Sequence, residues 1–201
     1  ALDATYTGTR TLTLGAATVT LVAGWPEPPA AWALTDDAER KNAISVIVRL
    51  EYAGKSILFG GDTVGRHIGK PPDTCIAAEK AMVDNAGQVP IDSDVLIAPH
   101  HGADNACSLD FVRAVSPSFV VFSCGNQHDH PRVSTVERFK LAGFPLTHGT
   151  NAFRTDRDGK AGDAVEWQDG LQSGGEDSRG DDGVEARIAG DGRVTVAYAR
   201  P

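Results

Sequence analysis

Residues 94–102 of the chain read Asp-Val-Leu-Ile-Ala-Pro-His-His-Gly. A short apolar run bounded by turn residues is typical of a buried strand, and this run leads directly into two adjacent histidines. In an open α/β sheet, the loops at the carboxyl ends of the strands converge on one rim, and sites are built there. The stretch therefore predicts a layered α/β fold with a candidate site around His100 and His101.

The same arrangement follows two other predicted strands. Residues 56–62 read Ser-Ile-Leu-Phe-Gly-Gly-Asp, so Asp62 comes directly after a strand that returns from a hairpin with the alternating residues 44–50. Residues 119–122 are strongly apolar, and the polar side chains that follow them are Asn126, His128 and His130. Three strands thus bring carboxylate, amide and imidazole groups to one rim.

Helices are predicted between these strands, because apolar residues recur at helical spacing between capping and turn residues. They are a helix over residues 75–83 capped by Asp73 or Thr74, a helix capped by Ser108, and a helix with Pro131 in its first turn. Further strands are expected at residues 146–148 and 165–167. Alternating strands and helices indicate an α/β sandwich.

Both ends of the chain show hairpin patterns. Residues 12–14 and 19–22 alternate apolar and polar side chains around a Gly-Ala break. We expect residues 1–168 to form the main domain and the polar residues 169–183 to form a flexible loop. Residues 184–201 are then a C-terminal β-hairpin that packs on the same domain, since a lone hairpin is too small to be stable.

Composition narrows the function classes. The 201 residues carry 19 Lys and Arg against 27 Asp and Glu, a formal net charge of −8. This balance argues against a basic surface that grips phosphate backbones, although a bound metal can reverse the charge locally. With no apolar run of about 18 residues and no signal peptide, we expect no membrane span and a cytoplasmic location. Cys75, Cys107 and Cys124 are too few for a disulfide framework and are expected to be buried free thiols.

Aspartate and histidine at one rim indicate metal chemistry. Both are first-choice ligands for Zn or Mn, and a carboxylate can bridge two ions. Two such ions acidify a water between them and stabilise the attacking and leaving oxygens of a phosphoester. Taken singly, each feature has a plainer explanation: a Gly-Gly-Asp turn, exposed loop histidines, or Asp129 as a helix N-cap. Their common position after strands favours the site.

Five blocks of the sequence, taken in order, resemble the metallo-hydrolase domain of the ComEC-type competence proteins, which belong to the metallo-β-lactamase superfamily. The blocks are residues 42–46, 56–62, 94–102, 130–131 and 154–156. The resemblance implies an αββα sandwich, one or two Zn or Mn ions, and hydrolysis of a phosphoester substrate, DNA in the competence branch. A hydrolase of another ester remains an alternative, while β-lactam hydrolysis is disfavoured because the paired histidines resemble the nuclease-like branch.

The resemblance also implies a metal site made by Asp62, His100 and His101. Asp62 corresponds to the aspartate that bridges the metals and takes part in catalysis, and the histidine pair corresponds to a late histidine ligand. Of the pair, we expect His100 to be the ligand and His101 to lie behind it or to contact substrate. The sequence alone leaves that choice open.

The remaining roles implied by the resemblance concern the substrate. His130 and Asn126 are expected to face the scissile phosphate as catalytic residues. Arg154 and Asp156 are expected to shape the same rim and, with His101 and His130, to bind substrate.

One element of the superfamily is absent from the sequence. The early His-x-His-x-Asp-His ligand motif does not occur, so the chain resembles the second half of the sandwich. We therefore expect a metal-binding hydrolase that needs an upstream segment or a partner chain to complete its ligands and to cover its sheet. The alternative is a non-catalytic binding or regulatory module derived from this fold.

Overall fold

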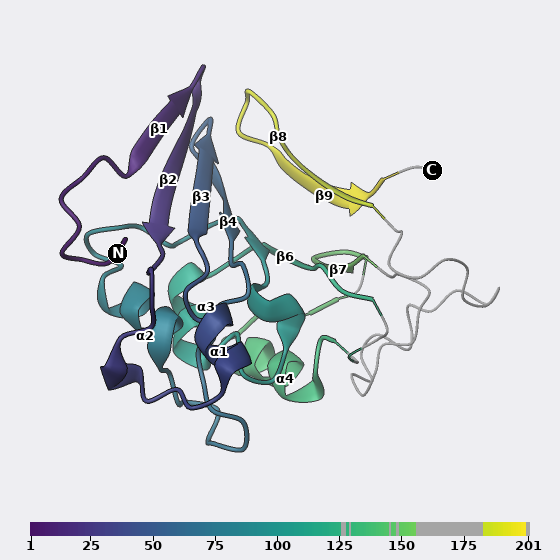
Figure 1. Cartoon of the computed structure of the whole chain (residues 1–201). Coiled ribbons are helices and arrows are strands. Elements are labelled where there is room, and N and C mark those ends of the chain that lie inside the picture. Colours follow the sequence, from purple (N-terminus) through teal and green to yellow (C-terminus); the bar gives the residue numbers. More distant parts are fainter. Residues whose placement is uncertain (126–127, 129, 145, 148, 156–182, 200–201) are drawn as a thin grey trace.

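The computed structural model describes residues 1–125, 128, 130–144, 146–147, 149–155 and 183–199. One mixed sheet of seven strands has helices on one face and a two-stranded hairpin on the other (Figure 1), which confirms the layered α/β fold. The strands of the sheet are β1 (Thr11–Leu14), β2 (Ala17–Ala23), β3 (Ile47–Tyr52), β4 (Lys55–Phe59), β5 (Val95–Ile97), β6 (Phe119–Phe122) and β7 (Ala152–Arg154), and the hairpin is β8 (Val184–Ile188) with β9 (Val194–Tyr198).

The strands lie in sequence order, and the sheet changes character at β4. Strands β1 to β4 pair antiparallel, with tight turns between β1 and β2 and between β3 and β4, whereas β4 to β7 pair parallel. Parallel neighbours need crossover connections, and helices supply them here. The helices are α1 (Asp37–Asn42), α2 (Ala77–Asp84), α3 (Leu109–Val115) and α4 (Val133–Leu141), with 3-10 turns η1 (Ala30–Trp32) and η2 (Pro99–Gly102).

The parallel strands are buried on both faces, which explains why they read as continuous apolar runs. Leu58, Leu96 and Val120 lie in the core on the helix side. On the other face, a second cluster joins the sheet to the hairpin; its buried members are Ile57, Val95, Val121, Phe153 and Val196. The hairpin therefore packs on this face of the sheet.

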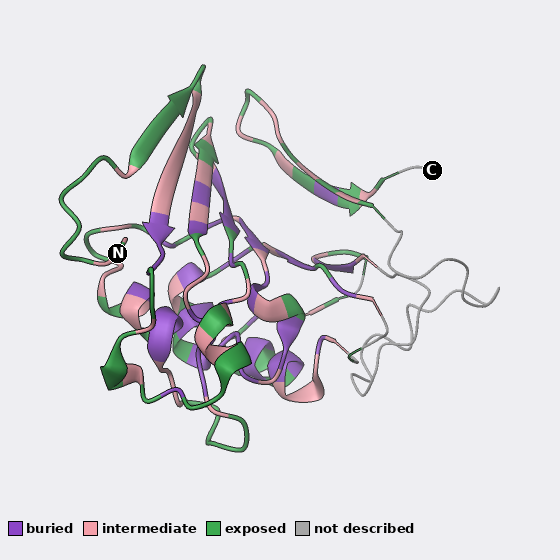
Figure 2. Ribbon diagram, viewed as in Figure 1, coloured by how far each residue is buried: buried purple, intermediate pink, exposed green. Residues whose placement is uncertain are grey.

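The antiparallel strands are covered less completely. Leu12 and Leu14 of β1 are 54% and 63% exposed, and Phe59 at the end of β4 is 41% exposed. Cross-strand partners share a face, so the register Leu12 to Val19 to Leu50 to Ile57 places Leu12 on the hairpin side. Figure 2 shows β1 exposed at the edge of the sheet, whereas most of β4, three strands further along, is buried. Among the described residues, the side chains of β1 are thus exposed, whereas the parallel strands are covered on both faces.

Two predicted helix starts are wrong. Helix α2 begins at Ala77 rather than near residue 75, and its N-cap is Ile76, not Asp73 or Thr74. The reason is tertiary, because the Ile76 N–H donates to the Gly65 carbonyl at 2.8 Å and keeps the chain extended there. Helix α4 begins at Val133, two residues after Pro131.

The N-terminus of α3 begins as predicted but is satisfied differently. Ser108 occupies the N-cap position, yet its side chain makes no capping hydrogen bond. The carboxylate of Glu79 on α2 instead accepts hydrogen bonds from the backbone N–H groups of Cys107 and Ser108, both at 2.7 Å. Burial raises the pKa of Glu79 above its usual value.

Other predictions have mixed outcomes. Residues 146 and 147 form no strand, and the last strand of the sheet is β7 instead. The strand expected at 165–167 and most of the loop at 169–183 lie outside the described residues. All three cysteines are free, with Cys107 and Cys124 buried and Cys75 half-buried. In the part of the chain that the structure describes, no helix has the length and apolarity needed to cross a membrane.

Candidate functional site

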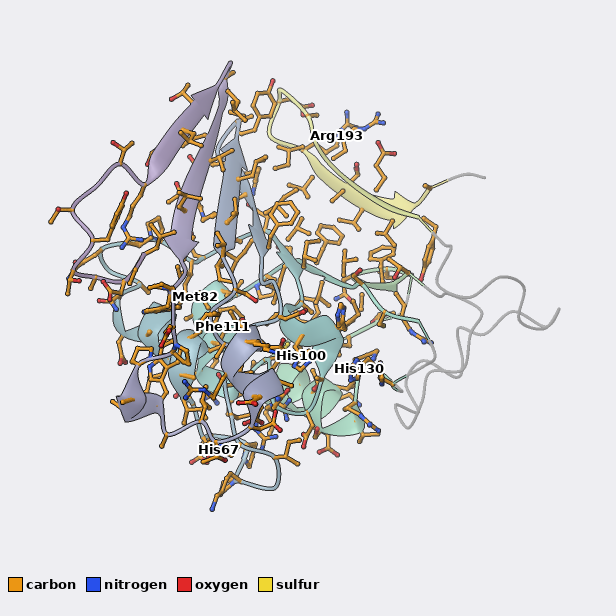
Figure 3. All side chains as sticks on the ribbon, in the orientation of Figure 1. His67, Met82, His100, Phe111, His130 and Arg193 are labelled. Atoms are coloured by element: carbon orange, nitrogen blue, oxygen red, sulfur yellow. The ribbon has the colours of Figure 1, made fainter. Side chains whose placement is uncertain are left out.

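Three histidines from two loops gather at the carboxyl end of the parallel strands. His100 and His101 follow β5, and His130 lies in the loop between β6 and α4. The ring centroids of His100 and His130 are 6.3 Å apart, those of His101 and His130 are also 6.3 Å apart, and those of His100 and His101 are 6.2 Å apart. Figure 3 shows His100 and His130 near each other at this end of the sheet, with His67 in a separate loop.

Two glycines let the loops after β4 and β5 meet. A Cβ atom on Gly60 would lie 2.7 Å from Cδ of Pro99, so only glycine fits against the start of the histidine turn. The Gly60 N–H donates to the Ile97 carbonyl at 3.0 Å, and the His100 N–H donates to the Gly61 carbonyl at 2.8 Å. The loop that carries Asp62 is thereby attached to the loop that carries the histidines.

The histidine turn has a strained backbone. His100 and His101 both adopt left-handed conformations, with φ of 46° and 58°. Non-glycine residues in this region cost roughly 1–3 kcal/mol each, and such strain persists at functional sites where the surroundings enforce it. Gly102 follows with φ of 83°, and a Cβ there would lie 2.6 Å from the ring of Phe122. The turn is therefore held in place by the packing around it.

Asp62 and His101 face each other. Nε2 of His101 lies 3.4 Å from Oδ1 of Asp62, and both side chains are about half exposed. On the far side of the ring, Nδ1 donates to the Ser123 carbonyl at 2.5 Å. A carbonyl oxygen only accepts, so Nδ1 of His101 carries a proton, and Nε2 is the nitrogen that faces the carboxylate. A backbone carbonyl behind Nδ1 is the arrangement in which proteins present histidine to a metal.

His100 is engaged on both nitrogens. Its Nδ1 lies 2.9 Å from Oδ1 of Asn105, and its Nε2 lies 3.2 Å from Nδ2 of Asn42. Of the two adjacent histidines, His101 is thus the one whose nitrogen faces a carboxylate. The geometry favours the reverse of the roles that the resemblance implied for this pair.

His130 is held neutral. Burial lowers the pKa of His130 to about 4, and the charge of the nearby His100 is the second largest cause. The adjacent backbone is fixed to the histidine turn, since the Arg132 N–H donates to the Gly102 carbonyl at 3.1 Å. A neutral ring beside the other two histidines can donate a hydrogen bond without adding positive charge.

The other candidate residues lie differently. Arg154 ends β7 and is 1% exposed, and its backbone N–H donates to the hydroxyl of Tyr198 on the hairpin at 3.4 Å. Its expected role in substrate binding stays a prediction. Asn126 and Asp156 lie outside the described residues.

Two of the implied ligands are paired, but no complete metal site is formed by the described residues. Among them, no group of three or more His, Cys, Asp or Glu side chains is placed to hold a metal ion. Catalytic zinc sites use three protein ligands and an open position. Asp62 and His101 supply two side chains of the kind that such a donor set uses.

Sequence reasoning missed the residues that support the histidines. Asn42 contacts His100, the Ser45 hydroxyl accepts a hydrogen bond from the Asp62 N–H at 3.2 Å, and Asn105 holds the other side of His100. Asn42 and Ser45 belong to the 42–46 block, which the sequence singled out without assigning it a role. Their polarity inside an otherwise strand-like block was the available signal.

The comparisons with known proteins point to competence proteins. No protein-family model matches the chain. The chain is 31% identical over 128 residues to Competence protein ComA of Neisseria gonorrhoeae, an overlap that covers 61% of this chain and 16% of that protein. The chain thus matches about a sixth of the length of this relative, and the match agrees with the resemblance to competence proteins.

Proposed function

We propose that the chain is part of a metal-dependent phosphoester hydrolase of the metallo-β-lactamase type, in which Asp62 and His101 are metal ligands. The observation that carries the proposal is the facing pair itself, with Nε2 of His101 at 3.4 Å from Oδ1 of Asp62 and its Nδ1 anchored on a backbone carbonyl. Carboxylate and imidazole donors suit Zn or Mn. This assignment makes His101 the ligand and gives His100 a supporting role.

A Zn or Mn ion supplies Lewis-acid chemistry, which polarises a phosphoryl oxygen and acidifies a water. The contribution of the chain is to prearrange its own groups. Ser45 fixes the backbone of Asp62, and the Ser123 carbonyl fixes the ring of His101. Preorganised groups of this kind do not have to reorient during the reaction.

His130 is proposed to hold the substrate rather than to transfer a proton. Its ring lies 6.3 Å from those of both His100 and His101, close enough to reach a phosphoester at the pair. A ring N–H that donates to a phosphoryl oxygen would orient the scissile bond. DNA is the proposed substrate class, supported by the similarity to a competence protein.

A second candidate function is a binding module without catalysis. It is favoured by the finding that the described residues provide two paired ligand side chains and no group of three or more. The two functions differ in whether the ligand set becomes complete in the whole protein.

The experiment combines metal analysis with hydrolysis. The chain, and the chain joined to any polypeptide that precedes it, would be assayed for bound metal and for cleavage of bis-p-nitrophenyl phosphate and plasmid DNA with Mn or Zn. Stoichiometric metal and chelator-sensitive cleavage, both lost in Asp62→Ala and His101→Ala but retained in His67→Ala, would support the hydrolase. Full cleavage after complete chelation would contradict it, and absence of both metal and cleavage from every form would favour the binding module.

A further inference from the structure

We infer that Glu39 and Asn105 are positioning residues that set which nitrogen of His100 carries the proton. They do so through a chain of hydrogen bonds that runs from Glu39 through Asn105 and His100 to Asn42. The inference rests on the proposed function, because it describes how a histidine beside the ligand pair is presented.

The chain of contacts is continuous. Oε1 of Glu39 accepts from Nδ2 of Asn105 at 3.3 Å, Oδ1 of Asn105 lies 2.9 Å from Nδ1 of His100, and Nε2 of His100 lies 3.2 Å from Nδ2 of Asn42. Asn105 is 6% exposed, so water does not compete freely for its amide.

The polarity of the chain follows from its acidic end. A carboxylate accepts hydrogen bonds and does not donate them, so the amide nitrogen of Asn105 faces Glu39 and its carbonyl oxygen faces His100. The carbonyl oxygen can only accept, so Nδ1 of His100 must donate and therefore carries the proton. The lone pair of Nε2 then accepts from the Asn42 amide. The direction of the hydrogen bonds is thus set from the carboxylate of Glu39.

The two residues at the ends of this hydrogen-bond chain lie on one face of helix α1. Glu39 and Asn42 are three residues apart on α1, a spacing that places their side chains on the same face. The helix is fixed at its start by Asp36, whose side chain accepts from the Ala38 and Glu39 N–H groups, both at 2.9 Å. Glu39 and Asn42 are therefore held at a fixed separation by the same helix.

Asn105, in the middle of the hydrogen-bond chain, is anchored by its backbone independently of His100. Its backbone carbonyl accepts from the Gly65 N–H at 2.9 Å and from the Arg66 N–H at 3.1 Å. The neighbouring Asp104 is held by an ion pair with Arg66 at 2.9 Å and by a second ion pair with Arg138 at 3.5 Å. Asn105 thus acts as a fixed support for the strained histidine turn.

The consequence is a matched presentation of the two histidines. Both donate from Nδ1, His100 toward Asn105 and His101 toward Ser123. Nε2 of His101 faces Asp62, whereas Nε2 of His100 faces the Asn42 amide. Nε2 of His100 is therefore occupied by its hydrogen bond with Asn42, while Nε2 of His101 remains the nitrogen proposed to bind the metal.

The test reads the tautomer directly and needs no metal or substrate. The full chain, labelled with ¹⁵N-histidine and treated with chelator, would be studied at pH 8 by long-range ¹H–¹⁵N correlation NMR, with His100 assigned from the spectrum of His100→Gln. We expect a protonated Nδ1 in His100 of the unaltered chain. Asn105→Ala and Glu39→Gln should each shift the equilibrium roughly fivefold toward the Nε2–H form, the effect of one hydrogen bond. The double variant Glu39→Gln with Asn105→Asp keeps an acceptor toward His100 and places a donor amide opposite the new carboxylate, so it should restore the Nδ1–H form.

Asn42→Ala is the matched control, because it removes the other contact of the same ring. We expect it to leave Nδ1 of His100 protonated, since the proton position is set from the Glu39 side. An Nε2–H form in the unaltered chain, no change in both Asn105→Ala and Glu39→Gln, or loss of the Nδ1–H form in Asn42→Ala would overturn the inference. Glu39→Gln, an exchange of similar size on helix α1, keeps the test decisive if Asn105→Ala fails to fold.

Turnover provides a separate readout. In an active form of the protein, Asn105→Ala should lower kcat/KM about 10- to 100-fold, as loss of a residue that orients a site histidine commonly does. The double variant Glu39→Gln with Asn105→Asp should recover most of it. A protein that shows the tautomer shift but no hydrolysis would leave this inference standing while refuting the hydrolase. The reverse result would refute only the inference.

Discussion

The two halves of the sheet differ in strand direction and in burial, although they belong to one hydrogen-bonded sheet. Strands β4 to β7 are parallel and packed on both faces, with Val95 and Leu96 fully buried. Strands β1 to β3 are antiparallel, and Leu12 on the same sheet is 54% exposed. The candidate site residues Asp62, His100, His101 and His130 all follow strands of the parallel half. The comparison teaches that the site belongs to the half with the better-packed support.

The largest expected effect concerns the rim of the parallel half. Asp62→Asn keeps the size of the side chain but removes the charge that faces His101, so we expect hydrolysis to fall by roughly 10³-fold, the scale of metal-assisted charge stabilisation. Steady-state rates on a phosphodiester would measure it, with circular dichroism to confirm the fold. Asp110→Asn, on the exposed surface of α3, is the control and should retain the full rate. A rate for Asp62→Asn within threefold of the unaltered protein would remove Asp62 from the site.

Shortening a leucine side chain to alanine should cost far more stability in the parallel half of the sheet than in the antiparallel half. Leu96→Ala empties a fully buried position and should lower the free energy of unfolding by about 2–5 kcal/mol. Leu12→Ala, at an exposed position of β1, should change it by no more than about 0.5 kcal/mol. Urea denaturation of the two variants gives the comparison. Equal losses would show that a further surface covers β1 in solution.

How far the sequence predicted the fold depends on how local each signal is. Strand β6 was predicted with its bounds and the hairpin β8–β9 within residues 184–201, because an apolar run or an alternation between turn residues is contained within the segment. The starts of α2 and α4 were wrong, because contacts made by residues distant in sequence hold the preceding backbone extended.

The site shows the same limit. Its location at the strand ends was predictable from Asp62 and the histidine pair. The choice between His100 and His101 was not, because it depends on partners 58 residues away at Asn42 and 22 residues away at Ser123. No pattern within residues 94–102 records those contacts.

Two glycines sharpen the comparison at the level of the backbone. Gly102, in the histidine turn, has a positive φ, and an added Cβ would meet the Phe122 ring at 2.6 Å. Gly102→Ala should therefore destabilise by about 1–3 kcal/mol through overpacking and strain. Gly15, in the β1–β2 turn, also has a positive φ but has open space around it, so Gly15→Ala should cost about 1 kcal/mol or less. Thermal unfolding of both variants would test the order, and a larger loss at Gly15 would contradict it.

The smallest effect is expected at Cys75, away from the rim. Burial raises the pKa of the Cys75 thiol to about 12, so the thiol stays protonated at neutral pH and reactivity should rise only as the pH approaches that value. Iodoacetamide should modify it slowly in the folded chain at pH 8 and rapidly in urea, and Cys75→Ser should leave metal binding unchanged. Rapid modification of the folded chain would contradict the buried, inactive thiol.

The claim that His101 rather than His100 pairs with Asp62 at the metal is tested most directly by binding affinity. Isothermal titration of Mn²⁺ into the protein, including any polypeptide that precedes this chain, would be compared for His100→Ala and His101→Ala. The geometry predicts that His101→Ala weakens binding at least about tenfold more than His100→Ala, because Nε2 of His101 faces Asp62 while Nε2 of His100 is engaged by Asn42. A larger loss in His100→Ala, or equal losses in the two variants, would contradict the account.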